Sequence, residues 1–213
     1  MKYTVEEAIE DEIIAPYNIF IHTVDLDTLI KKKNSKGKLV TEKNQYDNYT
    51  YVINKSTREK RDISFLAIHR NRILQNSLSK YNKTLYLINK YKEESILVFT
   101  GLKKIAESLN IPYYHSTSKN EEVFEDFKKG KIKHLSVCGI GKSGVTYENL
   151  DTIILNSFTG NEEVTEQLIS RGQLLDTPDK VVNIHIITSS EPAEVKKLSK
   201  ALINFNKENI KWI

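Results

Sequence analysis

A Gly-Lys-Ser triplet, Gly141-Lys142-Ser143, follows an apolar run that predicts a β-strand. Glycine-rich loops that bind nucleotide phosphates end in this triplet, because backbone N–H groups and the lysine surround the phosphates. The complete loop also needs a glycine five residues before Gly141, where this chain has Ser136, and a helix directly after it. Residues 144–151 lead instead to another predicted strand. We therefore interpret the triplet as a chance match and keep an independent phosphate-loop enzyme only as an alternative.

The sequence contains few other candidates for metal-binding or catalytic residues. Asp11-Glu12 has the residue types of a magnesium-binding pair, but it falls on the polar side of a predicted amphipathic helix, where acids are ordinarily solvated. The single cysteine, Cys138, excludes an internal disulfide, and the five histidines have no metal-ligand spacing. We expect no metal site in this chain.

The charge of the whole chain is only mildly basic. Its 32 Lys and Arg residues nearly match its 28 Asp and Glu residues, for a net charge of +4. Lys31-Lys32-Lys33, Lys36 and Lys38 form the densest basic cluster, around Gly37. These lysines either contact phosphates or simply keep an exposed loop soluble.

The length and composition are those of one α/β domain. With 213 residues and 39% hydrophobic residues, the chain can bury a core of its own. Residues 1–93 are predicted to hold a linker, a strand with a hairpin and a long helix, and residues 94–213 the core. The longest apolar runs, 96–99 and 184–187, are far shorter than the roughly 20 residues that span a bilayer. We expect a cytoplasmic protein, in the host cytoplasm if it is viral, with no membrane partner.

The first part of the chain contains few regular elements. Thr4 and Glu7 form a capping box, which predicts a helix over 4–14, and a strand follows over 17–24. Residues 31–54 are polar and rich in lysine and tyrosine, typical of an insertion or adaptor hairpin with a weak strand at 49–53. Apolar residues at helical spacing predict one long helix, with a bend allowed, over 62–91.

Strands and helices alternate in the second part. The pattern predicts a parallel sheet flanked by helices, because connections between parallel strands normally contain a helix. The predicted strands cover 96–100, 112–115, 133–138, 152–156 and 181–188. The predicted helices cover 102–109 and 121–129, a segment from Gly160 through Gln167 and Arg171, and a final stretch after Pro192.

Read in order, these elements resemble the C-terminal RecA-like lobe of superfamily 2 helicases. The matching stretches are Ile96 to Gly101 with Ala106 and Leu109 (motif IV), Tyr114 to Thr117, Phe127 to Lys131, Leu135 to Cys138 with Gly144 and Asn149 to Ile154 (motif V), and Gln167 with Ser170-Arg171 (motif VI). Upstream, Glu7 to Asp11 with Pro16-Tyr17, and Arg70 to Leu74 with Lys80, resemble the branch of phage recombination helicases and restriction-type translocases.

The resemblance implies a role for several residues. ATP and Mg²⁺ would lie between two lobes and be held mainly by an N-terminal lobe, in cis or in trans. Arg171 would be the arginine finger, the catalytic residue of this lobe. Gly144, Thr146 and Gln167 would complete the nucleotide site. The resemblance also implies a track for a single- or double-stranded nucleic acid, with DNA as the expected strand. Its residues would be Thr100, Gly101, His115, Ser116, Cys138, Gly139 and Lys142.

Each implied role has a structural alternative. Arg171 beside Gly172 could cap a helix C-terminus, and Gly144 and Thr146 could form a plain turn. His115 could be a satisfied structural histidine, and Cys138 a small buried residue.

Motif VI departs from the family pattern at two positions. Ser170 replaces its glycine, and Leu174 replaces its second arginine. Because the chain has neither a complete phosphate loop nor an Asp-Glu strand end, we expect no ATP hydrolysis by the chain alone. A catalytically degenerate nucleic-acid-binding or regulatory module remains the second functional hypothesis.

Overall fold

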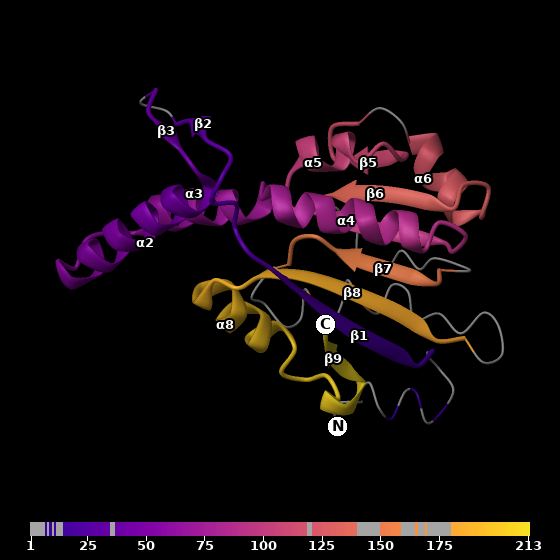
Figure 1. The fold of residues 1–213 in the computed structure, drawn as a ribbon. Coiled ribbons are helices and arrows are strands. Elements are labelled where there is room, and N and C mark those ends of the chain that lie inside the picture. The colour runs from indigo at the N-terminus through magenta and orange to yellow at the C-terminus, as the bar shows by residue number, and fades with distance from the viewer. Residues whose placement is uncertain are drawn as a thin grey trace.

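The computed structural model describes residues 7, 9, 11, 15–34, 37–118, 121–139, 150–158, 165, 169 and 180–213. Its centre is a seven-stranded sheet in the order β5-β6-β4-β7-β8-β1-β9, and every neighbouring pair is parallel. The strands are β1 (Tyr17–Val24), β4 (Ile96–Thr100), β5 (Tyr113–His115), β6 (His134–Cys138), β7 (Thr152–Leu155), β8 (Val182–Ser189) and β9 (Ile210–Trp212). The predicted α/β class, a parallel sheet flanked by helices, is confirmed (Figure 1).

Helices cover both faces of this sheet. Alternate residues of the central strands face a large cluster that includes Phe124 and Phe127 of α6 (Glu121–Lys128) and Leu198 of α8 (Pro192–Ala201). The other residues of the same strands pack with Leu87 and Ile88 of α4 (Leu78–Lys90). Because both faces are buried, the strands are continuous apolar runs rather than alternating ones. α5 (Lys103–Ser108) follows β4.

The predicted long helix is broken into two. α3 (Ser64–Gln75) ends at Asn76, and Ser77 is extended, with φ −63° and ψ 130°. The backbone N–H of Leu78 donates to the carboxylate of Glu42, at 3.2 Å to Oε1. A carboxylate at the first turn satisfies free N–H groups and favours the helix dipole, so the new start at α4 is stabilised.

The predicted weak strand at 49–53 is wrong, because these residues lie within α2 (Glu42–Arg58). The helix starts where the Thr41 side chain accepts the N–H of Asn44 at 3.2 Å. Tyr46 and Ile53, seven residues apart, are buried on one side, and Tyr46 packs with Leu74 of α3. This packing overrides the β-propensity of the Tyr-Thr-Tyr-Val-Ile run.

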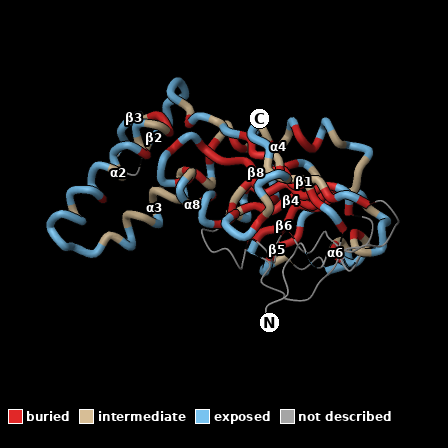
Figure 2. Tube along the Cα trace, turned by 90° about the horizontal axis from the view of Figure 1, so that it is seen from below, coloured by how far each residue is buried: buried red, intermediate tan, exposed pale blue. Residues whose placement is uncertain are grey.

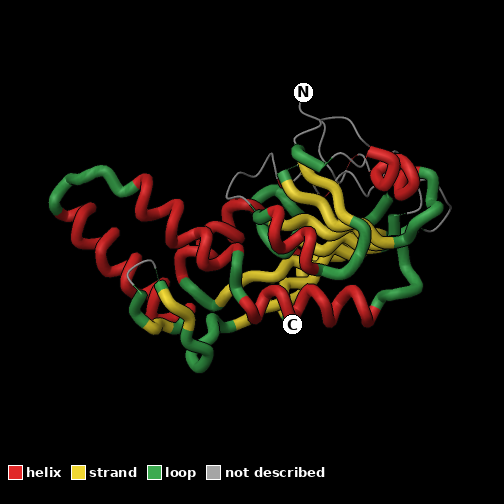
Figure 3. The backbone as a smooth tube through the Cα atoms, turned by 90° about the horizontal axis from the view of Figure 1, so that it is seen from above, coloured by secondary structure: helices red, strands yellow, loops and turns green. Residues whose placement is uncertain are grey.

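A short ribbon precedes α2. β2 (Lys32–Lys33) pairs antiparallel with β3 (Leu39–Val40), so a hairpin occurs in the predicted insertion. Figures 1 and 3 show that the ribbon, α2 and α3 project beyond the sheet. We call residues 31–76, which contain these elements, the arm.

Two predicted helices lie mostly outside the described residues. Within the helix at 4–14, Glu7 and Ile9 are helical, and in the segment from 160 to 171, Thr165 and Ile169 are helical. In the described part of the chain, no helix is long and apolar enough to cross a membrane.

Candidate nucleic-acid interface at the strand ends

Three neighbouring strands end in one row at the carboxyl edge of the sheet. Cys138, the last residue of β6, is the register partner of Thr100 in β4 and of His115 in β5. Gly101, Ser116 and Gly139 each follow one of these residues directly. The fold therefore brings together six of the seven residues named for the nucleic-acid track. Ligands of open parallel sheets bind at this edge, outside the carboxyl ends of the strands.

The ring of His115 is fully engaged within the protein. Its Nε2 lies 2.9 Å from Oε1 of Glu107, and its Nδ1 lies 3.2 Å from Oγ1 of Thr117. That hydroxyl in turn accepts from Nζ of Lys103 at 2.9 Å. With Nε2 donating to the carboxylate and Nδ1 accepting from the hydroxyl, every polar atom of the buried ring has a partner. This geometry favours the structural alternative for His115, which shapes the loop, while the neighbouring Ser116 is exposed.

Thr100 and Cys138 are also turned into the protein. The Thr100 hydroxyl lies 3.2 Å and 3.3 Å from the carbonyl oxygens of Leu102 and Val137. The Cys138 side chain is buried, and burial raises the pKa of its thiol, which keeps it protonated at neutral pH. A ligand at this row can therefore contact backbone groups and the side chains of the loops, but it meets no thiolate.

Two glycines let the backbone form this edge. Gly139 has φ 66°, a left-handed conformation that favours glycine. Gly101 is needed for a different reason, since a Cβ there would lie 2.6 Å from Oγ of Ser157 and 2.7 Å from Nε2 of Gln75. Gln75 at the end of α3 lies 3.5 Å from the same Ser157 hydroxyl. The edge of the sheet is therefore packed directly against the C-terminal end of α3.

Our reading of the sequence missed Gln75, Lys103 and Ser157 at this edge. Ser157 follows a predicted strand, so the carboxyl-end rule could have included it. Nothing in the sequence marks Gln75, because its position depends on the break between α3 and α4.

The residues named for the nucleotide lie outside the described part of the chain. These are Arg171, Gln167, Gly144 and Thr146, together with Lys142 of the nucleic-acid track. Among the residues that the structure does describe, no group of three or more His, Cys, Asp or Glu side chains is arranged to hold a metal ion.

Comparison with known proteins finds a matching family model and a solved structure of similar fold. Residues 69–173 match the family model described as the helicase conserved C-terminal domain. A chain in the crystal structure of the E. coli DEAD-box protein SrmB bound to regulator of ribonuclease activity A has a similar fold, with a TM-score of 0.55 and 12% sequence identity over 93% of this chain and 90% of that chain. No curated protein sequence matches this chain significantly. Residues 69–173, just under half of the chain, are thus similar in sequence to the helicase conserved C-terminal domain, and the parallel sheet has a RecA-like fold.

Proposed function

We propose that this chain is the C-terminal lobe of an ATP-dependent superfamily 2 helicase or translocase, and that a nucleic-acid strand runs across the row at the ends of β4, β6 and β5. The observation that carries this proposal is the register that aligns Thr100, Cys138 and His115 at one edge of a helicase-type sheet. Gly101, Ser116 and Gly139 lie at the same edge and supply backbone N–H groups and a hydroxyl. Such groups hold phosphates and sugars rather than base edges, so binding is independent of sequence.

In this proposal, ATP hydrolysis needs a second lobe. That lobe holds ATP and Mg²⁺ with a phosphate loop that these 213 residues do not contain. Arg171 supplies the finger that neutralises charge on the transferred phosphoryl group, and Gly144, Thr146 and Gln167 complete the nucleotide site from this side. Closure of the lobes on ATP and their opening after hydrolysis move the strand. We infer DNA as the strand from the resemblance to phage recombination helicases and restriction-type translocases.

ATP hydrolysis by the purified chain tests the proposal. The chain alone should show no turnover, with or without single-stranded or duplex DNA, and a phosphate-gripping lobe added in trans or fused should restore it. Arg171→Ala should then reduce the partnered turnover by about a thousandfold or more. Arg171→Lys serves as the matched variant, because it keeps the charge but loses the planar fork that grips phosphate oxygens.

Two results would contradict these assignments. Robust turnover by the chain alone that Lys142→Ala abolishes would establish the phosphate-loop alternative. Unchanged partnered turnover in Arg171→Ala would exclude Arg171 as the finger.

A degenerate binding module is the second candidate, and Leu174 at the position of the second motif VI arginine favours it. Losing one of two cations weakens stabilisation of the transition state. This candidate predicts strand binding by the chain, but no turnover with any added lobe. Restoring the cation with Leu174→Arg should then raise partnered turnover.

A further inference from the structure

The arm is far more basic than the rest of the chain. Twelve of the 32 Lys and Arg residues lie within residues 31–76, together with only four of the 28 Asp and Glu residues. The arm therefore carries +8, and the other 167 residues carry −4. Charge of one sign, concentrated on one projecting element, attracts a polyanion.

The arm is a built element with its own packing. Tyr46 of α2 packs with Leu74 and Leu26, and the Arg70 guanidinium lies 5.5 Å from the centre of the Tyr46 ring. Tyr49 stacks on His69 of α3, with ring centres 5.8 Å apart and planes 6° from parallel. These contacts hold the two helices together, while most of their remaining surface is exposed, as Figure 2 shows.

The outer face of α2 has the chemistry of a nucleic-acid surface. Residues at spacings of four and three lie on one face of a helix, and all five residues of this stripe are exposed: Asn44, Asn48, Tyr51, Lys55 and Arg58. The stripe contains two amides, an aromatic ring and two cations, and beside it lies the exposed carboxylate of Asp47, which pairs with Lys43 at 2.6 Å. Tyr51 is 69% exposed. Lys55 and Arg58 form no ion pair with any residue of the described ranges, so both charges are available to a ligand.

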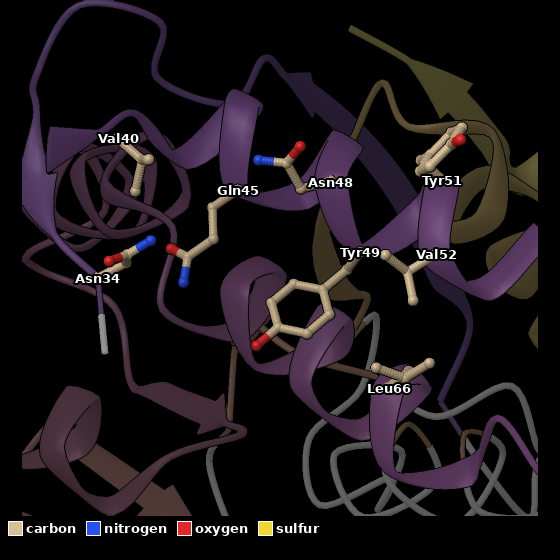
Figure 4. Close-up of a pocket in the computed structure, with 8 residues that line it drawn as sticks. All are labelled: Asn34, Val40, Gln45, Asn48, Tyr49, Tyr51, Val52 and Leu66. Atoms are coloured by element: carbon tan, nitrogen blue, oxygen red, sulfur yellow. The ribbon is translucent and has the colours of Figure 1, made fainter. Parts of the chain in front are cut away.

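A pocket connects this stripe to the lysine-rich ribbon. It has a volume of about 340 Å³, and its lining includes Asn34 of the ribbon with Asn48 and Tyr51 of the stripe. Figure 4 shows the amides of Asn34 and Gln45 near each other at one end of the pocket. The ribbon adds exposed lysines beside it, namely Lys31, Lys32, Lys33 and Lys38.

We propose that the arm is a second nucleic-acid contact, separate from the row at the strand ends, which binds the phosphodiester backbone through its cations and stacks an unpaired base on Tyr51. The inference rests on the proposed function, because it assumes that the chain acts on a nucleic-acid strand. Phosphate neutralisation by Lys and Arg dominates the affinity of such surfaces, and stacking on an exposed ring tolerates any base. The net charge of +8 on the arm favours a polyanion over a protein partner of mixed charge.

Fluorescence anisotropy with labelled single-stranded oligonucleotides, one of DNA and one of RNA, tests this contact on the full chain at several salt concentrations. Lys55→Glu/Arg58→Glu should weaken binding by about tenfold or more and should lower the slope of log affinity against log salt by about 1.4. The matched control is Lys196→Glu/Lys200→Glu, two exposed lysines of α8 in which Lys200 likewise lies in the last turn of its helix. This control should change the affinity less than about twofold.

Additional variants separate charge, stacking and folding. Tyr51→Ala should weaken binding by about fivefold or more, and Tyr51→Phe should preserve it, because phenylalanine retains the stacking surface. Lys33→Glu/Lys38→Glu changes the ribbon and leaves α2 intact, so it tests the arm even if the α2 variant fails to fold. Circular dichroism of each variant verifies the fold.

Ser116→Glu, which places a carboxylate in the row, distinguishes the two contacts. If it weakens binding while all arm variants bind as the wild type does, the arm inference is overturned and the proposed function stands. If the arm variants weaken binding and Ser116→Glu does not, the arm is supported as a nucleic-acid contact and the row at the strand ends is excluded as one. A wild-type chain that binds neither oligonucleotide at low salt overturns both proposals.

Discussion

Lowering the pH from 7 to 5 should destabilise the chain through two histidines buried side by side. His22 of β1 and His185 of β8 are 4% and 1% exposed, and Nε2 of His22 lies 2.9 Å from Nδ1 of His185. The His185 ring also packs between Phe20 and Tyr91, at 5.0 Å and 4.9 Å between ring centres. The other ring nitrogens, Nδ1 of His22 and Nε2 of His185, have no hydrogen-bond partner among the described residues. The site therefore accepts neutral imidazoles and opposes charged ones.

The size of the effect follows from the pKa values of the two histidines. Burial, with a smaller contribution from nearby lysines, lowers the pKa of His22 from 6.5 to about 4. Burial, followed by His22 and then by the same lysines, lowers the pKa of His185 from 6.5 to about 3. The unfolded chain binds these protons more strongly than the folded chain does. The stability is therefore complete above pH 6.5 and falls as the pH drops toward 4. Between pH 7 and pH 5 each histidine should cost about 2 kcal/mol, so the pair should lower the free energy of unfolding by up to about 4 kcal/mol.

Urea denaturation at pH 7, 6 and 5 measures this free energy. The window ends at pH 5 because carboxylates begin to titrate below it. The control is the double variant His22→Leu/His185→Phe, which removes both titrating rings and retains an aromatic ring between Phe20 and Tyr91. Its stability should change little over the same window. A wild-type chain equally stable at pH 7 and pH 5, or a double variant with the wild-type pH dependence, would refute the argument.

Three substitutions test contacts that hold the fold together. Lys80→Met should lower the free energy of unfolding by about 3–5 kcal/mol, because it leaves the buried Glu194 carboxylate, whose Oε1 lies 2.5 Å from Lys80 Nζ, without its partner. Adding Glu194→Gln to this variant should recover much of that free energy. Equal losses for the single and double variants would exclude this pairing. Gly101→Ala should lower the free energy of unfolding by about 1–3 kcal/mol, since the new Cβ would lie 2.6 Å from Ser157 Oγ. An unchanged melting temperature would contradict that close approach. Thr41→Ala should cost about 1 kcal/mol by removing the N-cap of α2, whereas Thr41→Ser should cost little.

The central strands could be predicted from the sequence because they are buried on both faces. The predictions over 17–24 and 96–100 match β1 and β4 residue for residue. β9 escaped prediction for the opposite physical reason. It is three residues long, lies at the edge of the sheet, and its Lys211 and Trp212 are exposed, so no apolar pattern marks it.

The helix α2 could not be predicted from local propensity. Residues 49–53 are tyrosine, threonine, valine and isoleucine, which favour strands. What makes them helical is the burial of Tyr46 and Ile53 on a face that meets α3, a contact between segments separated by a turn. The same limit applies at the candidate interface. The ends of the strands could be located from the sequence, but the approach of Gln75 to Gly101 depends on tertiary structure.

The mild net charge of the whole chain conceals the basic arm, on which the proposed second nucleic-acid contact depends. A charge in salt solution acts over about 10 Å, so a strand near the arm meets the charge of the arm rather than the sum over the molecule. The acidic residues that reduce the total to +4 lie mostly outside the arm, in a part of the chain that carries −4. Because α2 and α3 project from the sheet, the basic arm is set apart from the part of the chain that carries most of the acidic residues (Figure 3). For a domain with a projecting element, charge counted element by element is therefore a better guide to a polyanionic partner than the isoelectric point.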